Sequence, residues 1–147
     1  MEVNLHIYSG IGNLIAIVDG IRNDLHISSK EVDHVYNFHG VNFDQLIILL
    51  PPSDPQNDLD VKIFNNDGSI ASNCINGARC VGRFIKDNSL LASNKFKVKT
   101  DGGLWELNNV ENNIFSAAFE VKAEIITKKV EALSLIHISE PTRLRSI

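Results

Sequence analysis

Residues 64–80 read FNNDGSIASNCINGARC, and this stretch carries the strongest structural signal in the chain. Asn66-Asp67-Gly68 is a turn signal, and the residues from about Asn76 to Lys86 have the apolar spacing of a helix. Cys74 therefore lies just before the first turn of a predicted helix. Backbone N–H groups of a first turn lack partners inside the helix and carry partial positive charge, which favours a thiolate or a bound carboxylate. We predict a reactive Cys74 whose pKa lies below the ordinary value of about 8.5.

Short β-prone runs surround this helix on both sides. A second, shorter helix is predicted between Ser28, a good N-cap, and Gly40, and the proline-rich residues 51–55 predict a loop. Strands are predicted at 3–8, 14–18, 45–50, 60–64, 96–100 and 104–107, after the 66–68 turn, and within 114–126. Many short strands around one apolar helix indicate an α+β fold with an antiparallel sheet.

The composition is that of an ordinary globular domain. The chain has 147 residues, of which 44% are hydrophobic and 22% charged, which corresponds to one domain. The net charge of −4 provides no basic footprint for nucleic acid. No apolar run approaches the ~18 residues that span a bilayer, and residues 1–6 lack the basic segment followed by an apolar core that is typical of a targeting signal. We therefore expect a cytoplasmic protein without nucleic-acid or membrane partners.

The side chains that usually bind metals or cofactors are poorly spaced. The five histidines show no His-x-x-x-His pair, and the two cysteines lie six positions apart, which is neither a zinc nor a redox spacing. Gly10-Ile11-Gly12 lacks the third glycine of a dinucleotide fingerprint. We predict no metal site and no nicotinamide cofactor. Because residues six apart on a helix face different sides, Cys80 is expected to point toward the core.

Three blocks of sequence together resemble one family. They are Gly10-Ile11-Gly12-Asn13, Phe43-Asp44-Gln45-Leu46 and the stretch 64–80. In order and spacing the chain is similar to the diaminopimelate epimerases from about residue 5 to about residue 107, the N-terminal half of that family. The resemblance implies a barrel-like sheet wrapped around a central helix, one half of a two-domain fold. It also implies cofactor-independent interconversion of LL- and meso-diaminopimelate in lysine biosynthesis, by two thiols on opposite faces of the substrate α-carbon.

The resemblance assigns roles to six positions. Cys74 matches one of the two catalytic cysteines, and Asn13, Gln45 and Asn65 match substrate-binding positions. The backbone of Ile75 and Asn76 matches the pair that holds the substrate carboxylate. Without the resemblance, the three amide residues would be interpreted as turn or strand-end residues, and Cys74 either as a buried structural thiol or as a catalytic one.

One departure from the family bears on the carboxylate-binding pair. The family has a glycine where this chain has Ile75. If the backbone were left-handed at this position, a β-branched side chain would be costly there. We therefore expect strain, or an altered substrate fit, at Ile75.

The end of the chain does not match the family. Residues 133–147 resemble translated sequencing-adapter sequence, and we expect them to be an artefact that follows a truncated half-domain over residues 1–132; a genuine divergent terminus is the alternative. The second catalytic cysteine would then belong to a missing half, and the chain alone is expected to be inactive. Two other hypotheses stay open: a related racemase or isomerase of the proline racemase type, and a non-catalytic fragment. A homodimer of the complete protein is compatible with the sequence.

Overall fold

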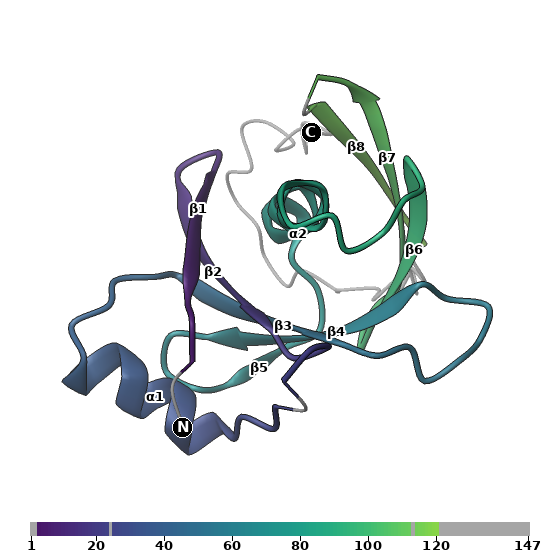
Figure 1. The fold of residues 1–147 in the computed structure, drawn as a ribbon. Coiled ribbons are helices and arrows are strands. Elements are labelled where there is room, and N and C mark those ends of the chain that lie inside the picture. The colour runs from purple at the N-terminus through teal and green to yellow at the C-terminus, as the bar shows by residue number, and fades with distance from the viewer. Residues whose placement is uncertain (1–2, 24, 113, 121–147) are drawn as a thin grey trace, which may run out of the picture.

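A single curled sheet builds most of the molecule, and a computed structural model describes residues 3–23, 25–112 and 114–120. The strands are β1 (His6–Gly10), β2 (Asn13–Asp19), β3 (Gln45–Leu50), β4 (Leu59–Asn65), β5 (Ile70–Ala71), β6 (Lys95–Thr100), β7 (Gly103–Glu111) and β8 (Ile114–Phe119). The helices are α1 (Ser29–Phe38) and α2 (Ile75–Asp87). Figure 1 shows the sheet curling like half a barrel, with α2 in its concave side and α1 outside.

The sheet is mixed, which corrects the prediction of an antiparallel sheet. Its order is β1-β2-β3-β4-β6-β7-β8, with β5 added beside β4. Within the described residues five strand pairings are antiparallel, whereas β2–β3 and β4–β6 are parallel. Parallel neighbours need a long crossover connection. Helix α1 lies in the crossover between β2 and β3, and α2 lies in the crossover between β4 and β6.

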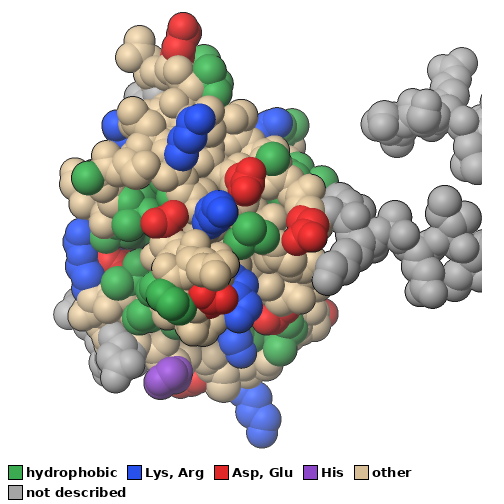
Figure 2. Space-filling model, turned by 90° about the vertical axis from the view of Figure 1, so that its right-hand side faces the viewer, with side chains coloured by type: hydrophobic (Ala, Val, Ile, Leu, Met, Phe, Trp, Pro, Cys, Tyr) green, Lys and Arg blue, Asp and Glu red, His purple; other side chains and the backbone are tan. Residues whose placement is uncertain are grey.

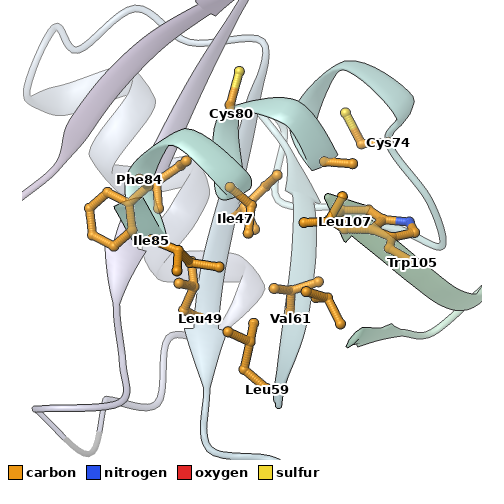
Figure 3. Packing of buried hydrophobic residues seen from close by; sticks show 14 of the residues in the cluster. Ile47, Leu49, Leu59, Val61, Cys74, Cys80, Phe84, Ile85, Trp105 and Leu107 are labelled. Atoms are coloured by element: carbon orange, nitrogen blue, oxygen red, sulfur yellow. The ribbon is translucent and has the colours of Figure 1, made fainter. Parts of the chain in front are cut away.

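Alternation along the strands produces two apolar layers, one on each face of the sheet. Residues that face α2 include Ile15, Ile47 and Ile63, and Figure 3 shows part of this layer with Phe84 and Ile85 of the helix. The opposite face buries Ala16, Val18, Leu46, Ile48 and Phe64 against Val32 of α1. The helix prediction for α2 is confirmed, because its apolar side, Ala78, Val81, Phe84 and Ile85, is buried.

The element boundaries follow the predictions to within a residue or two except at two strands, one of which is β7, predicted at 104–107 and extending to Glu111. The strand predicted at 3–8 begins at His6 instead. Val3 and Leu5 pack against the α1-side layer rather than pairing in the sheet. The strand predicted within 114–126 is β8 as far as Phe119. Residues beyond 120, including the predicted artefact at 133–147, lie outside the described residues.

The surface and the helix lengths complete the description. On the face drawn in Figure 2, acidic and basic side chains are interspersed with small apolar patches. Neither helix of the described part of the chain is long and apolar enough to cross a membrane.

Candidate active site

Cys74 is the N-cap residue of α2, so its predicted position at the start of the helix is confirmed. Its backbone is extended (φ −150°, ψ 104°), as is usual for an N-cap. The sulfur accepts a hydrogen bond from the Gly77 backbone N–H (3.1 Å), and the Cys74 carbonyl accepts one from Ala78 (3.1 Å). The thiol thus occupies the place where serine or aspartate normally caps a helix.

Burial raises the pKa of the Cys74 thiol, although the backbone N–H groups of Gly77 and Asn76 act to lower it. The prediction of a lowered pKa is therefore wrong for this structure. The residue is only 8% exposed and belongs to the apolar layer under α2. Loss of hydration disfavours the thiolate more than two N–H groups stabilise it.

Two glycines allow the start of α2 to approach the sheet closely. A Cβ atom on Gly77 would lie 2.5 Å from Ile47 Cδ1 and 2.8 Å from the Cys74 sulfur. A Cβ atom on Gly10, at the end of β1, would lie 2.9 Å from the Cys80 sulfur and 3.2 Å from the Asn76 carbonyl oxygen. At both glycines the shortest of these distances, 2.5 and 2.9 Å, is too short for a side chain unless a neighbouring atom moves. The first turn of α2 is therefore pressed onto β3 and against the end of β1.

Asn13, Gln45 and Asn65 lie at one edge of the sheet. Asn13 begins β2, Gln45 begins β3 and Asn65 ends β4. Gln45 is in register with Asn65, and Ile15 is in register with Gln45. Strand side chains alternate between faces, so the three amides continue the inward rows of Ile15, Ile47 and Ile63 on the face that α2 covers.

A hydrogen bond connects Gln45 to Asn65, whereas Asn13 and Cys74 have other partners. Gln45 Nε2 donates to Asn65 Oδ1 at 3.0 Å, and Asn65 Nδ2 donates to Ser69 Oγ at 3.0 Å. Asn13 pairs with Gly10, the residue that packs against Asn76. The Cys74 sulfur is hydrogen-bonded to Gly77 instead of to an amide side chain. The result is a row of amides at the same edge as the first turn of α2.

The expected backbone strain at Ile75 does not occur. Ile75 is the first residue of α2, and the non-glycine residues with positive φ in the described part of the chain are Ile11, Ser89 and Asn112. A helical backbone accepts a β-branched residue at little cost. The Ile75 side chain is 62% exposed and thus projects into solvent beside the buried thiol.

Sequence reasoning missed the contacts of Asn73 and Trp105. Asn73 Oδ1 accepts hydrogen bonds from the Cys74 backbone N–H (2.9 Å) and from Trp105 Nε1 (2.7 Å). The single tryptophan of the chain could have indicated such a contact, because a buried indole N–H usually finds a hydrogen-bond partner. The partner itself could not be identified, since the two residues lie 32 positions apart.

Metal ligands do not gather in the described part of the chain: it contains no group of three His, Cys, Asp or Glu side chains arranged to bind an ion. Cys80, on α2, is buried in the apolar layer that the helix covers, as predicted. The groups that the structure brings to the site are one thiol, a helix N-terminus and amide side chains.

Comparison with known sequences points to one family. The family model for diaminopimelate epimerase matches residues 5–119. The chain is 43% identical over 100 residues to the diaminopimelate epimerase of Stutzerimonas stutzeri (strain A1501), covering 67% of this chain and 36% of that protein. It is 41% identical over 100 residues to the diaminopimelate epimerase of Pseudomonas fluorescens (strain Pf0-1), with the same shares covered. The chain thus spans about a third of the length of these relatives.

Solved structures agree on the fold. A PhzF-family phenazine biosynthesis protein of Bacillus anthracis superposes with a TM-score of 0.58 at 20% identity, covering 77% of this chain and 38% of that one. A methylitaconate-delta-isomerase superposes with a TM-score of 0.56 at 21% identity, covering 84% of this chain and 66% of that one. At this level of identity the likeness concerns architecture only.

Proposed function

The chain belongs to the diaminopimelate epimerase family, and we propose that it supplies one catalytic half of a cofactor-independent amino-acid epimerase. In this proposal residues 1–132 form the N-terminal half-domain of a two-domain enzyme. The substrate is diaminopimelate, whose LL and meso forms differ in configuration at one α-carbon. The observation that carries the proposal is the placement of Cys74: a buried thiol caps a helix whose first turn packs on β3 and the end of β1, the sheet edge where Asn13, Gln45 and Asn65 begin or end their strands.

The placement of Cys74 suits proton transfer at an amino-acid α-carbon. That proton is very weakly acidic, so the base must be dry, aligned and close to groups that stabilise charge developing toward the carboxylate. The thiol is buried, and the N–H groups of Ile75 and Asn76 belong to the first helical turn, where no intrahelical acceptor is available. These N–H groups would bind the substrate carboxylate, aided by the helix dipole.

A raised thiol pKa is compatible with this role. A thiol that stays protonated at neutral pH can deliver a proton, and the same group acts as the base once a second thiol has taken the opposite protonation state. A bound substrate also brings an ammonium group, whose positive charge would favour the thiolate. In the proposed cycle Cys74 therefore changes role with the direction of the reaction.

The three amide residues would recognise the polar ends of the substrate. An amide side chain offers both donors and an acceptor, so Asn13, Gln45 and Asn65 can bind either an ammonium or a carboxylate group. The Gln45–Asn65 hydrogen bond orients both side chains before substrate arrives. This pre-organisation lowers the entropic cost of binding.

The second thiol must come from outside the described residues. The chain contains two cysteines, and Cys80 is packed against Gly10 and the core. An epimerase that inverts configuration needs an acid on the face opposite its base. We expect the 147-residue chain alone not to catalyse exchange.

Deuterium incorporation at the α-carbon tests the proposal. The complete protein, expressed from its uninterrupted gene, should exchange the α-proton of diaminopimelate in D₂O, and Cys74→Ser should lower the rate by at least roughly a hundredfold. Cys80→Ala is the matched control and should retain the rate. Full activity of Cys74→Ser would exclude the proposed role. Exchange with proline but not with diaminopimelate would instead favour a racemase of the same fold.

A further inference from the structure

A single amide oxygen connects the core of the sheet to the start of α2. Asn73 Oδ1 accepts one hydrogen bond from Trp105 Nε1 at 2.7 Å and another from the Cys74 backbone N–H at 2.9 Å. The first donor belongs to β7, and the second belongs to the N-cap residue of α2. The oxygen therefore bridges two elements that are far apart in the sequence.

The Trp105 end of this bridge is rigid. Trp105 is fully buried, pairs with Val98 on one side and Phe119 on the other, and packs edge-on against the Phe119 ring. Figure 3 shows Trp105 and Cys74 at the same end of the apolar layer. Because the indole ring cannot turn without disturbing three strands, its N–H provides a fixed point for the Asn73 side chain.

A second contact ties the same segment to the same hairpin. The Gly102 backbone N–H, in the turn between β6 and β7, donates to the Ser72 carbonyl oxygen at 2.8 Å. A Cβ atom on Gly102 would lie 2.6 Å from that oxygen, so the turn approaches the segment closely. Both residues that precede Cys74 are thus attached to the β6–β7 hairpin.

The bridge determines where the sulfur points. The hydrogen bond to the Cys74 N–H fixes the plane of the Asn73–Cys74 peptide group, and from that plane the extended backbone of Cys74 (φ −150°) brings the sulfur to the Gly77 N–H. If the Cys74 N–H lost its acceptor, the N-cap residue could rotate and the sulfur could leave the helix terminus. The effect would reach the thiol without any change at the thiol itself.

We propose that Asn73 and Trp105 are positioning residues of the site. They hold Cys74 in its N-cap conformation and keep its sulfur hydrogen-bonded to the Gly77 N–H. The inference rests on the proposed role of Cys74. Neither residue touches the sulfur, so neither is catalytic. The pair acts on the orientation of the thiol.

Two substitutions of Asn73 separate positioning from general stability. The residue is exposed at the surface, so its replacement does not open the core. Asn73→Leu removes the acceptor, and we expect hydrogen exchange at the Cys74 and Gly77 amides of the 147-residue chain to become roughly fivefold faster. Exchange at Phe84 and Ile85, at the other end of α2, should stay unchanged. Trp105→Phe keeps an aromatic ring but removes the N–H donor and should give a smaller change at the same two amides.

Asn73→Asp is the conservative variant, and retained protection in it would show that the acceptor oxygen itself holds Cys74. Its carboxylate keeps an acceptor oxygen, so protection of both amides should be retained. Its negative charge beside the thiol disfavours the thiolate, so the pH profile of Cys74 alkylation, measured in a Cys80→Ala background, should move to higher pH. Val32→Ala, a core substitution on α1, is the control for general destabilisation and should leave the profile in place.

The proposal is overturned if Asn73→Leu leaves the Cys74 and Gly77 amides unchanged, or alters them only in parallel with Phe84 and Ile85. It is also overturned if Asn73→Asp, which keeps the acceptor oxygen, loses the protection of these two amides as Asn73→Leu does. If Trp105→Phe does not fold, the two Asn73 variants decide alone. These measurements need no turnover, so a complete protein without epimerase activity would refute the proposed function while leaving the positioning result intact.

Discussion

The two ends of α2 are held to the sheet by different chemistry. At the N-terminus the contacts are neutral hydrogen bonds. The Gly77 N–H donates to the Cys74 sulfur, and Asn73 Oδ1 accepts from both the Cys74 N–H and Trp105 Nε1. At the C-terminus they are charged. Arg22 donates to the Asn88 carbonyl oxygen at 3.1 Å.

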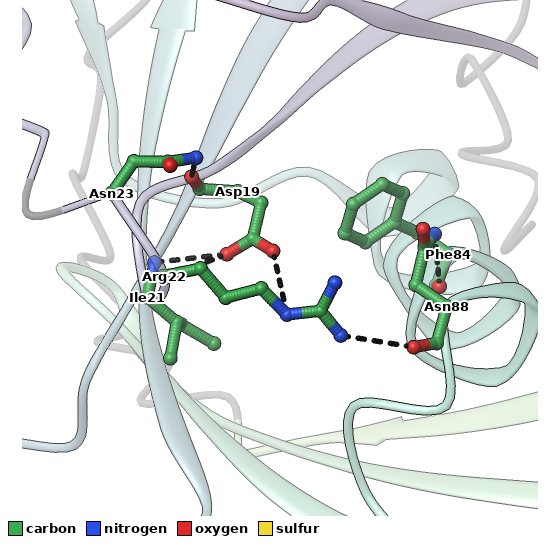
Figure 4. Close-up of polar contacts among 6 residues, drawn as sticks. All are labelled: Asp19, Ile21, Arg22, Asn23, Phe84 and Asn88. Atoms are coloured by element: carbon green, nitrogen blue, oxygen red, sulfur yellow. Dashed lines mark hydrogen bonds and ion pairs between the residues drawn. The ribbon is translucent and has the colours of Figure 1, made fainter.

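The charged contacts at the C-terminal end form a small network. Arg22 lies 3.5 Å from Asp19 in an ion pair (Figure 4). Asp87 accepts hydrogen bonds from the Tyr8 hydroxyl at 3.2 Å and from Arg83 Nε at 2.8 Å. The Arg22 guanidinium complements the negative end of the helix dipole, and the contacts of Tyr8 and Arg22 attach this end of the helix to β1 and to the segment that follows β2.

The difference leaves one helix end available to a ligand. The first turn of α2 contains no acidic residue, whereas the last turn carries Lys86 and is met by Arg22. Partial positive charge at the N-terminus is therefore not neutralised by the protein and can bind a carboxylate. Glycines and neutral hydrogen bonds bring this end close to the sheet without adding charge beside the thiol.

Filling the space beside the thiol should have the largest effect. An Ala in place of a helix-interior Gly usually stabilises a helix by about 1 kcal/mol, but Gly77→Ala places a methyl group against the sulfur and Ile47. We expect the free energy of unfolding, measured in urea, to fall by about 1–3 kcal/mol. We also expect Cys74 to be alkylated faster, because the sulfur is displaced. In the complete protein, kcat should fall roughly a hundredfold.

Gly82→Ala is the matched control for Gly77→Ala. Its methyl group would meet the Phe115 ring at 2.7 Å, so it introduces a similar steric conflict in the middle of the same helix. We expect a comparable loss of stability with an unchanged rate of Cys74 alkylation. Equal alkylation changes in both variants would contradict a special role of the N-terminal end.

Alkaline pH should lower the stability of the chain in two steps, first at Cys80 in the middle of α2 and then at Tyr8, which contacts its C-terminal end. Burial, followed by the charge of Cys74, raises the pKa of the Cys80 thiol to about 11, whereas an unfolded cysteine ionises near about 8.5. Burial and then Asp87 raise the pKa of Tyr8 to about 12, against about 10 in an unfolded chain. Both groups stay protonated to higher pH in the folded chain than in the unfolded chain. The stability that they contribute is therefore complete below the pKa of the unfolded state and is lost as the pH rises to the pKa of the folded state.

Urea unfolding from pH 8 to pH 12 measures this loss. Cys80→Ala should abolish the loss of stability between about pH 8.5 and pH 11. Tyr8→Phe should abolish the loss between about pH 10 and pH 12. A Cys80→Ala chain whose stability falls as steeply as that of the parent below pH 10 would contradict the assignment.

The fold and the site were predictable to different extents, for physical reasons. The continuous apolar run in Gln45–Leu50 and the helical spacing around Val81 indicate burial, so the positions of β3 and α2 could be predicted. Strand partners could not, because alternation is the same in parallel and antiparallel pairs. The direction of the Cys74 pKa change depends on burial by distant strands, which local sequence does not reveal. The convergence of Gln45 and Asn65 was accessible only through the family resemblance.

Relieving strain next to the N-terminal end should stabilise the chain. Ile11 and Gly12, in the turn between β1 and β2, have φ of 47° and 85°, the signs that a type I′ turn requires and that asparagine and glycine prefer. Ile11 is 73% exposed, so its side chain gains little from packing. Ile11→Asn should raise the free energy of unfolding by about 1 kcal/mol. Ile11→Val keeps the β-branch and should leave it unchanged; equal values for both variants would show that the turn is not strained.

Removing the charged contact at the other end should have the smallest effect. Arg22 is mostly exposed, and the side-chain contact with Asp19 is long, so its electrostatic contribution is screened by water and salt. Arg22→Ala should lower the free energy of unfolding by about 0.5 kcal/mol at low ionic strength, and the difference from the parent should shrink in 1 M NaCl. Exchange at the Cys74 and Gly77 amides should not change, because the neutral contacts that orient the thiol lie at the opposite end of α2. A Cys74 alkylation rate that responded to Arg22→Ala would mean that the charged end of the helix also controls the thiol.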